Sequence, residues 1–427
     1  MKLMADATKK FVINGQKPLS GVIKVKGAKN AALKVFPLAL MTGEPIKIVN
    51  LPDIEDCHRA QEMLVALGHK AVNLGNGVME IQRQNKTCLN LPAELVNKFR
   101  ASIMFVGPLL ATCGEVYFPH PGGCVIGAGT RPIDMFLDGF ARMGTKIETL
   151  ENSYRLTAKK LQGASIFFSK VTVTGTESLM TTACLAQGET ILENCAMEPE
   201  IPALANFLNS MGAKISGAGT PTIKIEGVAK LSGGQYKIIP DRIEAGTFAI
   251  LAAAANSGEI IIEDCEPKHL GALWSLFDKI GVNYKLDKTS IAISPSEKLL
   301  AVDLVTHEYP GFATDLQSAY TVLMTQANGA SLIHETIYDR RLLFADMLTQ
   351  MGANIIMADP HRIVVNGPTQ LYSRKLMSPD LRAGMALVMA ALIAKGTTEI
   401  NNIYQIERGY ENLAERLAGL GADIKKV

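Results

Sequence analysis

The sequence has few aromatic residues, little net charge and no long apolar segment. Aromatic residues make up 6% of its 427 residues, and the formal net charge is +2. A general nucleic-acid binder usually carries a basic stripe, so we expect no nucleic acid as partner. The longest purely apolar runs, such as residues 383–394, have about a dozen residues, whereas a helix needs roughly 20 to cross a bilayer. We therefore expect no membrane-spanning segment and no membrane partner.

Common signatures of secretion, metal binding and nucleotide binding are also missing. The seven cysteines have no disulfide-framework spacing, and the N-terminal residues 1–15 hold no apolar stretch that could serve as a secretory signal. We therefore expect a cytoplasmic protein. No His/Cys spacing predicts a metal site. Neither GxxxxGK[ST] nor GxGxxG occurs, so the usual phosphate-binding loops of nucleotide enzymes are not expected.

Glycine, by contrast, is periodic. One series follows apolar residues at the expected ends of helices: Gly68, Gly144, Gly212, Gly281, Gly352 and Gly421. A second series opens the expected strands: Gly43, Gly114, Gly188, Gly258, Gly329 and Gly396. Neighbouring members of each series are 67 to 76 residues apart, which indicates a repeated supersecondary unit. Gly68 should lie just past a helix end, where glycine takes a positive φ at little cost.

Each repeat has the pattern of a mixed α/β unit. In the first copy, residues 30–41 predict an apolar helix, residues 46–50 a strand and residues 56–67 an amphipathic helix, and two further strands follow. Six such units are too many for one hydrophobic core. The sequence therefore predicts two domains of three units each.

Polar residues recur at two positions of the repeat. The starts of the apolar helices carry Lys29, Arg100, Thr172, Arg242, Asp315 and Arg382. The turns after the second glycine series carry Cys124, Arg131, Glu198, Glu200, Arg341 and Arg408. Helix starts have unpaired N–H groups and the positive end of the helix dipole, so helix starts that face the same way would form a phosphate or carboxylate site. Alternatively, Asp315, Asp380 and Ser378 only cap their helices.

Residues 119–134, PHPGGCVIGAGTRPID, predict a loop with a single thiol, Cys124. Prolines and four glycines are typical of a lid that brings a reactive group to a substrate. Beside an arginine or an anionic ligand, such a thiol can act as acid or nucleophile. The alternative is an incidental cysteine in a turn. The remaining cysteines are interpreted as packing residues: Cys57, Cys88, Cys113, Cys184, Cys195 and Cys265.

Over essentially the whole chain, the motifs resemble one family. They are GAKNAAL, FRASI, PGGC, RPID, EPEI, PDRIEAGTF, TDLQ, DLRA and IERGYE, of which PGGC together with GAKNAAL is highly specific. The chain resembles the enolpyruvyl transferases that act on UDP-N-acetylglucosamine. This resemblance implies an inside-out α/β fold with two similar domains, each of three βαβαββ units, and an active site in the cleft between them. It also implies that the chain crosses twice, so that residues 29–239 form one domain and residues 1–28 with 240–427 the other.

The resemblance also implies a reaction. The enolpyruvyl group of phosphoenolpyruvate is transferred to the 3′-hydroxyl of UDP-N-acetylglucosamine by addition and elimination, and phosphate is released. This is the first committed step of peptidoglycan synthesis, and with it of cell wall formation, cell shape and cell division. Both partners are small molecules, no cofactor is needed, and fosfomycin is expected to alkylate Cys124. Nothing in the sequence points to a particular oligomeric state.

Residue roles follow from the same resemblance. Cys124 is the general acid and can form an adduct with phosphoenolpyruvate, and Asp315 is the candidate base. The expected phosphoenolpyruvate ligands, of which Lys29 and Arg408 also count as catalytic, are Lys29, Asn30, Arg131, Arg341, Arg382 and Arg408. The expected UDP-N-acetylglucosamine ligands are Asn30, Arg100, Arg131, Pro132, Ile133, Asp134, Met135, Lys170, Val171, Thr172, Val173, Asp315 and Ile337. Without the resemblance, Lys170 could be a solvent-exposed lysine at a strand start, and Asp134 could be the N-cap of the next helix.

The chain departs from the family pattern in three places. Two additional residues separate Cys124 from Arg131, which could change how the loop closes. Glu407 stands where the family has Asp and could reposition Arg408. Met104 stands where one familiar member has Trp.

Two other functions share this repeat. A 5-enolpyruvylshikimate-3-phosphate synthase has the same fold and the same phosphoenolpyruvate chemistry, but would not be expected to carry PGGC. An RNA 3′-phosphate cyclase or a non-catalytic binding scaffold would need a nucleotidylated histidine or a basic face, and neither stands out. A paralogue that had lost its catalytic activity would be expected to lack Lys29, Cys124 or Arg408, and all three are present.

Overall fold

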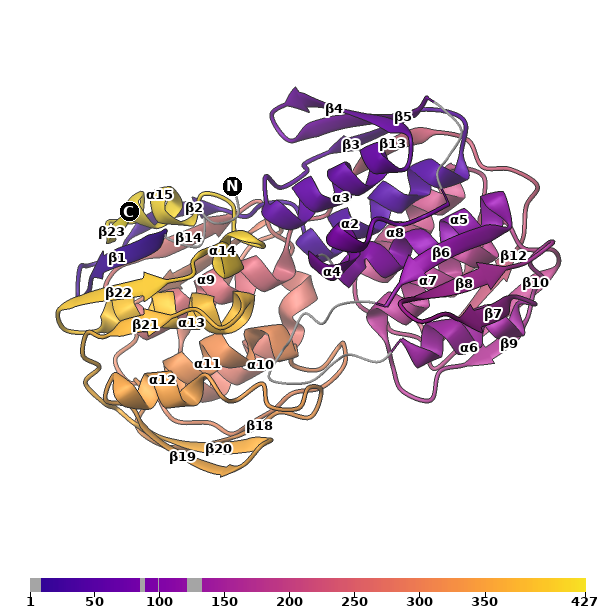
Figure 1. Ribbon diagram of the computed structural model, residues 1–427. Coiled ribbons are helices and arrows are strands. Elements are labelled where there is room, and N and C mark those ends of the chain that lie inside the picture. Colours follow the sequence, from indigo (N-terminus) through magenta and orange to yellow (C-terminus); the bar gives the residue numbers. More distant parts are fainter. Residues whose placement is uncertain (1–8, 85–88, 99, 121–132) are drawn as a thin grey trace. The chain divides into compact units, whose positions relative to one another are not determined.

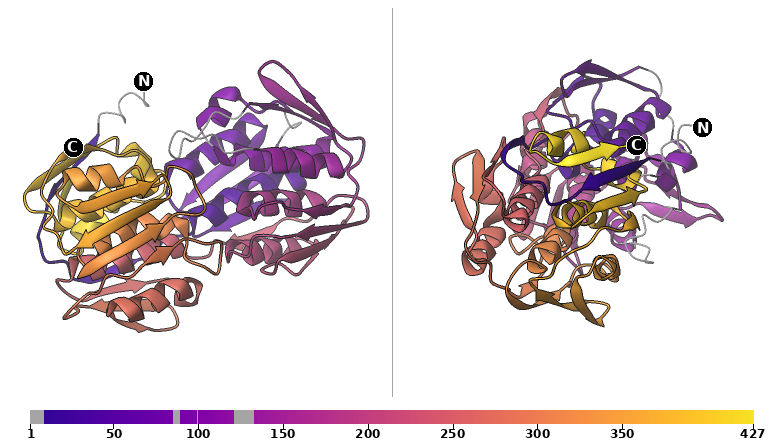
Figure 2. Two further views of the ribbon diagram at one scale, coloured as in Figure 1. Left: turned by 90° about the horizontal axis from the view of Figure 1, so that it is seen from below. Right: turned by 90° about the vertical axis from the view of Figure 1, so that its left-hand side faces the viewer.

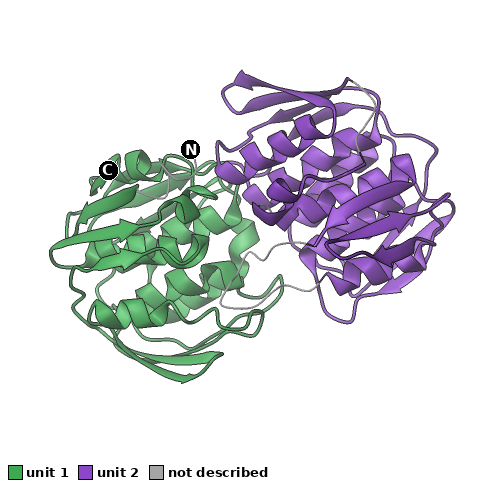
Figure 3. Ribbon diagram, in the orientation of Figure 1, with its two compact units in different colours: residues 1–26, 126–129, 240–427 green, residues 27–125, 130–239 purple. Residues whose placement is uncertain are grey.

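The computed structural model describes residues 9–84, 89–98, 100–120 and 133–427 (Figure 1). The chain folds as two compact units (Figure 3). Among the described residues, unit 1 contains those up to Lys26 and Pro240–Val427, and unit 2 contains those of Gly27–Ile239. The boundaries fall beside the starts of two apolar helices, at Lys29 and Arg242.

Three apolar helical segments form the centre of unit 2. They are α2 (Lys29–Val35) continued by the 3-10 helix η1 (Phe36–Met41), η2 (Arg100–Phe105) continued by α5 (Val106–Cys113), and α7 (Val173–Ala183). The segments pack against one another and most of their side chains are buried. A helix that is apolar on all sides is stable only when it is buried in a core. The apolar, alanine-rich composition of these segments therefore explains why they lie at the centre of the unit.

Unit 1 repeats this plan. Its central helices are α9 (Arg242–Ala255), α11 (Gln317–Met324) with the preceding turn η4 (Thr314–Leu316), and α13 (Leu381–Ile393). All three pack together. No helix in the described part of the chain has the length and hydropathy of a membrane span.

The described residues form six sheets around the two sets of helices. In unit 1 the position of the sheets outside the helices can be followed in Figure 2. In unit 2 the strands are β3 (Ile46–Val49), β4 (His69–Gly75), β5 (Val78–Arg83), β6 (Glu115–Pro119), β7 (Lys146–Thr149), β8 (Ser153–Thr157), β9 (Ser165–Phe167), β10 (Glu189–Glu193), β11 (Lys214–Ser216), β12 (Thr222–Glu226) and β13 (Gly234–Lys237). Their orders are β13-β3-β5-β4, β6-β8-β7 and β11-β12-β10-β9.

In unit 1 the strands are β1 (Lys10–Asn14), β2 (Gly21–Lys24), β14 (Ile260–Glu263), β15 (Asn283–Leu286), β16 (Ser290–Ser294), β17 (Leu304–Val305), β18 (Gly329–His334), β19 (Asn354–Asp359), β20 (Arg362–Gly367), β21 (Lys375–Met377), β22 (Thr397–Asn401) and β23 (Asp423–Lys426). Their orders are β15-β16-β14-β2, β17-β18-β20-β19 and β21-β22-β1-β23.

A second set of helices accompanies the central ones. In unit 2 they are α3 (Glu55–Ala66), α4 (Ala93–Lys98), α6 (Asp134–Arg142) and α8 (Glu200–Ser210). In unit 1 they are η3 (Pro267–Leu270) with α10 (Gly271–Ile280), α12 (Ala345–Gln350), α14 (Tyr404–Glu407) and α15 (Leu413–Ala418). The run β9-α7-β10-α8-β11-β12 is one complete βαβαββ unit, so the predicted fold class is confirmed.

The first glycine series ends six of these helices. Gly68 has φ +88°, just past α3, and its five counterparts have φ between +83° and +104°. The positive φ predicted for Gly68 is therefore confirmed. Side chains with a Cβ rarely adopt this conformation, which explains why the same residue recurs at every repeat.

Two strands belong to a different unit from the central helix that follows them in the sequence. The strand β2 directly precedes α2 in the sequence, yet it pairs in parallel with β14 of unit 1. Conversely, β13 precedes α9 but pairs in parallel with β3 of unit 2. Elsewhere, as in β9 and β10, the strands before and after one central helix pair with each other. Both strands lie where the chain passes from one unit to the other.

Candidate functional site at the starts of the central helices

In unit 1, two of the three central helices begin with an aspartate cap. Asp241 accepts hydrogen bonds from the backbone N–H groups of Ile243 and Glu244, at 2.8 and 3.1 Å. Asp380 accepts from those of Arg382 and Ala383, at 2.8 and 3.0 Å. The capping interpretation is therefore confirmed for Asp380, and Ser378 is not the cap of α13.

Asp315 does not cap a helix. Within the described chain, neither η4 nor α11 begins with a side-chain cap. Instead, Oδ1 of Asp315 accepts from Nη2 of Arg341 at 2.7 Å, and Oδ2 accepts from Nη2 and Nε of Arg382 at 2.9 and 3.1 Å. The capping alternative is wrong for Asp315, because its carboxylate pairs with Arg341, after β18, and with Arg382, at the start of α13.

This Asp315 cluster, made of Asp315, Arg341 and Arg382, is largely buried. The two arginine side chains are 5% and 8% exposed, and the carboxylate 26%. Burial alone would lower the pKa of both guanidinium groups, but the Asp315 carboxylate raises both pKa values above the ordinary value. The Glu335 carboxylate also raises the pKa of Arg341, and the Asp241 carboxylate that of Arg382. Both guanidinium groups therefore stay charged, and their fixed donors suit an anionic ligand.

The structure also gives the positions of the other predicted residues of unit 1. Arg408 ends α14 and donates from Nη1 to Oε1 of Gln405 at 3.2 Å. Glu407, the departure from the family pattern, forms an ion pair with Lys426. Ile337 lies half-buried in the turn after β18.

In unit 2, Lys29 is the first residue of α2, and its Nζ lies 2.7 Å from Oδ2 of Asp56 in the first turn of α3. Thr172 caps α7 by accepting from Gly175 N–H at 3.2 Å. In both units, then, a basic residue at a helix start has a carboxylate of the protein as its partner. This carboxylate offsets the unfavourable helix dipole.

The remaining predicted ligands of unit 2 lie at or near these helix starts. Lys170 is exposed, as its alternative interpretation expected, but it lies between β9 and α7 and not at a strand start. Asp134 is the first residue of α6 rather than its N-cap, which is Ile133, so the capping alternative is wrong there. The following predicted residues are half-buried: Asn30, Arg100, Met135, Val171, Thr172 and Val173. Cys124, Arg131 and Pro132 lie outside the described residues.

Four of the other cysteines are buried, as predicted: Cys57, Cys184, Cys195 and Cys265. Burial raises the pKa of the Cys184, Cys195 and Cys265 thiols to about 12, so these thiols are unreactive at neutral pH. Cys113 is exposed at the end of α5, so its interpretation as a packing residue is wrong. Cys88 lies outside the described residues.

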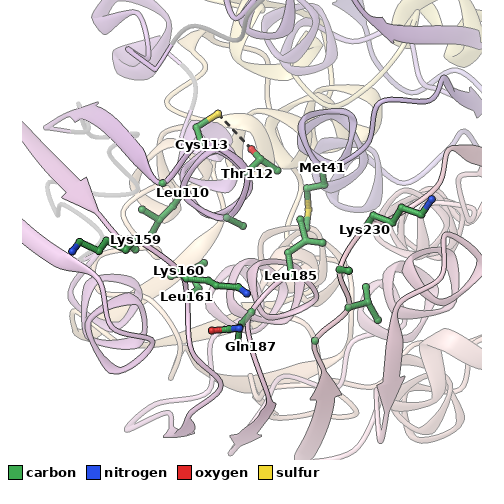
Figure 4. A pocket seen from close by; sticks show the side chains of 17 residues that line it. Met41, Leu110, Thr112, Cys113, Lys159, Lys160, Leu161, Leu185, Gln187 and Lys230 are labelled. Atoms are coloured by element: carbon green, nitrogen blue, oxygen red, sulfur yellow. Dashed lines mark hydrogen bonds between the residues drawn. The ribbon is translucent and has the colours of Figure 1, made fainter.

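A cavity of about 720 Å³ opens in unit 2 at the other end of the central helices (Figure 4). Its lining includes Met41, Cys113 and Leu185, which lie at or just past the C-terminal ends of these helices. Among the described residues, none of the predicted ligands lines it. The cavity therefore does not coincide with the predicted site at the helix starts.

A buried ion pair in unit 2 was missed by the sequence analysis. Lys34 of α2 pairs with Glu177 of α7, and their side chains are 7% and 0% exposed. Burial raises the pKa of Glu177 to about 7; the Lys34 ammonium opposes this rise, while the Glu200 and Glu198 carboxylates add to it. The sequence did contain a signal for this ion pair, because Lys34 and Glu177 are charged residues within otherwise apolar helices.

The Lys34→Met variant is expected to lower the free energy of unfolding by about 3 kcal/mol, because it leaves Glu177 buried without its counter-charge. Urea unfolding at pH 7.5 would measure the loss. The double variant Lys34→Met/Glu177→Leu should recover most of the stability, since the carboxylate is gone as well. A single Lys34 variant as stable as the wild type would mean that the pair contributes nothing.

Glu177 also predicts a pH dependence of stability. Its pKa in the folded chain, about 7, is above the ordinary value of 4.5, so between these values the folded chain binds the extra proton. The contribution of Glu177 to the free energy of unfolding therefore falls as the pH rises from about 4.5 to about 7. The difference in stability between the wild type and Glu177→Gln, measured across this range, should show that fall. A constant difference would contradict it.

With this geometry in place, the comparisons identify the family. Two units of α/β repeats with charged helix starts are the architecture of an enolpyruvyl transferase, and the family model for EPSP synthase (3-phosphoshikimate 1-carboxyvinyltransferase) matches residues 13–417. The enolpyruvyl transferase NikO from Streptomyces tendae is 25% identical, with a TM-score of 0.89 over 99% of both chains. EPSP synthase from Acinetobacter baumannii, 18% identical with a TM-score of 0.78 over 98% of this chain and 100% of that one, shares the fold.

The curated relatives are closer. Proteins from Koribacter versatilis, Halothermothrix orenii and Solibacter usitatus are 46%, 44% and 43% identical over 98% of this chain and 96%, 99% and 99% of theirs, and each is named UDP-N-acetylglucosamine 1-carboxyvinyltransferase. The chain therefore belongs to the EPSP synthase family of enolpyruvyl transferases, in the branch of the UDP-N-acetylglucosamine 1-carboxyvinyltransferases. The predicted resemblance is confirmed.

Proposed function

We propose that the protein transfers the enolpyruvyl group of phosphoenolpyruvate to the 3′-hydroxyl of UDP-N-acetylglucosamine and releases phosphate. Membership of the branch supports the choice of acceptor. The observation that carries the proposal is the Asp315 cluster, where one carboxylate lies between two buried guanidinium groups at a helix start. The cluster combines a proton acceptor with binding groups for an anion.

The reaction proceeds by addition and elimination. C3 of phosphoenolpyruvate takes a proton, and the 3′-oxygen bonds to C2 as its own proton leaves, which gives a tetrahedral ketal. The C2–O bond to phosphate then breaks and C3 returns a proton, so that the enol ether forms. We assign the proton donor to Cys124, which can also form a covalent adduct with phosphoenolpyruvate, and the proton acceptor to Asp315.

The remaining site residues bind the substrates. Arg341 and Arg382, with Lys29, Asn30, Arg131 and Arg408, would hold the phosphate and carboxylate of phosphoenolpyruvate. The following residues would hold UDP-N-acetylglucosamine, with Asn30, Arg131 and Asp315 shared: Arg100, Pro132, Ile133, Asp134, Met135, Lys170, Val171, Thr172, Val173 and Ile337. Fixed cations contribute most where water is excluded, because they need no reorganisation as charge develops.

The cellular setting follows from this reaction. The product commits UDP-N-acetylglucosamine to peptidoglycan, so the protein would serve cell wall growth and cell division from the cytoplasm. Fosfomycin would inactivate it by alkylating Cys124. The scheme uses no metal and no cofactor. The predicted domains, residues 29–239 and residues 1–28 with 240–427, are part of the same proposal.

Phosphate release from phosphoenolpyruvate tests the proposal, with UDP-N-acetylglucosamine or shikimate 3-phosphate as the only acceptor in metal-free buffer. Release with the sugar nucleotide alone is the expected result. Release with shikimate 3-phosphate alone would establish the EPSP synthase alternative instead. Release with neither would contradict both assignments.

A further inference from the structure

Glu335 is a fully buried carboxylate that follows β18 directly. Its backbone N–H donates to the carbonyl of His361 at 2.8 Å, and its own carbonyl lies 3.0 Å from Nδ1 of the same histidine. The residue is therefore fixed against the β19–β20 turn. A carboxylate at this depth is stable only if its oxygens are hydrogen-bonded.

One carboxylate oxygen holds a turn. Oε1 of Glu335 accepts from the backbone N–H groups of Ile337 and Tyr338, at 2.9 and 3.1 Å. Ile337 is a proposed contact of the sugar nucleotide. The ring of Tyr338 lies against the guanidinium of Arg341, with 5.2 Å from Cζ to the ring centroid. The turn therefore contains a predicted ligand of the sugar nucleotide, Ile337, and contacts a predicted ligand of phosphoenolpyruvate, Arg341.

The other oxygen acts through a hydroxyl. Oγ1 of Thr314 donates to Oε2 of Glu335 at 2.8 Å and accepts from Nη1 of Arg341 at 2.9 Å. An arginine can only donate, so the single hydroxyl proton must point to Glu335. This fixes the direction of both hydrogen bonds. Nη2 of Arg341 is then aimed at Oδ1 of Asp315, 2.7 Å away.

We infer that Glu335 is a positioning residue for phosphoenolpyruvate: through the Thr314 hydroxyl it holds Arg341 in the orientation that the anion needs, and through its second oxygen it holds the turn of Ile337. The inference rests on the proposed function, because Arg341 is assigned to phosphoenolpyruvate there. It predicts that the two oxygens have separable effects.

Variants at Glu335 and Thr314 separate the effects of the two carboxylate oxygens. In Glu335→Gln the amide oxygen can still accept from the two backbone N–H groups, while the amide N–H₂ faces Thr314. The hydroxyl would then receive two donors and lose its own acceptor. Thr314→Val removes the hydroxyl with little change in shape, and Thr314→Ser keeps it. Glu335→Ala removes both oxygens.

We expect Glu335→Gln and Thr314→Val each to raise the KM for phosphoenolpyruvate about tenfold, the size of one hydrogen bond to a charged group. The KM for UDP-N-acetylglucosamine should stay within about twofold, since the turn keeps its acceptor. The double variant should be no worse than either single one, because both act on the same contact. Thr314→Ser should match the wild type, and Glu335→Ala should raise both KM values.

The inference would be overturned if Glu335→Gln lowered only the melting temperature and left both KM values unchanged. Effects of Glu335→Gln and Thr314→Val that multiply in the double variant would equally contradict action through Thr314. Calorimetric titration of phosphoenolpyruvate makes the test independent of turnover. A wild type that released no phosphate would contradict the proposed function alone, and phosphoenolpyruvate affinities of wild type and Glu335→Gln would still decide the role of Glu335.

Discussion

Asp315→Asn is expected to lower kcat by about 10²- to 10⁴-fold, the usual range for loss of a general base. Asparagine can still accept one hydrogen bond from Arg341 or Arg382, but it cannot take the proton of the 3′-hydroxyl. Phosphate release at saturating concentrations of both substrates would measure the loss. Asp278→Asn, which removes an exposed carboxylate that accepts a hydrogen bond from the hydroxyl of Tyr284 in the same unit, is the matched control and should keep wild-type turnover.

The same variant should change anion binding in the opposite direction. Arg341 and Arg382 are nearly buried and both contact the Asp315 carboxylate, so its neutralisation leaves two buried cations with one counter-charge fewer. Inorganic phosphate should therefore raise the melting temperature of Asp315→Asn more than that of the wild type. Turnover within threefold of wild type would remove Asp315 from the role of base. An equal phosphate response would show that the arginine pair does not bind the anion.

Cys124→Ala is expected to lose turnover by about 10²- to 10⁴-fold, because C3 of phosphoenolpyruvate would lack its proton donor. Cys124→Asp should keep turnover, since a carboxylic acid can give the same proton, and should be insensitive to fosfomycin, since no thiol is left to alkylate. Initial rates before and after incubation with fosfomycin would measure both effects.

Cys113→Ala is the control for the thiol experiment. Cys113 is the exposed cysteine at the end of α5, and its removal should leave both turnover and fosfomycin sensitivity unchanged. An active Cys124→Ala variant would exclude the cysteine from the mechanism. Fosfomycin resistance in Cys113→Ala would move the reactive thiol to the other end of the helices.

Much of the fold could be read from the sequence because its signals are local. A helix that ends at Gly68 with φ +88° needs only its own backbone geometry. Likewise, an apolar helix such as α13 is buried wherever it forms. The charged residues at the helix starts were found because the repeat brings equivalent positions into register.

The partners of those charged residues could not be read in the same way. Asp315 pairs with arginines 26 and 67 residues further along, and Lys34 with a glutamate 143 residues away. No local pattern distinguishes such a carboxylate from a helix cap, and this is why the capping alternative for Asp315 was wrong. No local pattern predicts the pairing of β2 with β14 or of β13 with β3 either, because each strand directly precedes a helix of the other unit. Only the resemblance to the family implied that the chain crosses twice.

The position of β1 has a consequence for how the chain is made. This strand lies between β22 and β23, so the first described strand to leave the ribosome completes its sheet only with the last. Its neighbour β2 waits for β14, some 239 residues later, which is roughly 10–50 s of translation at 5–20 residues per second. Unit 2 needs nothing beyond β13 and can fold during that interval. Until its partners are made, each of these two strands has open edges and must avoid pairing with neighbouring chains. We therefore expect the yield of active protein to depend on the pace of translation as well as on final stability.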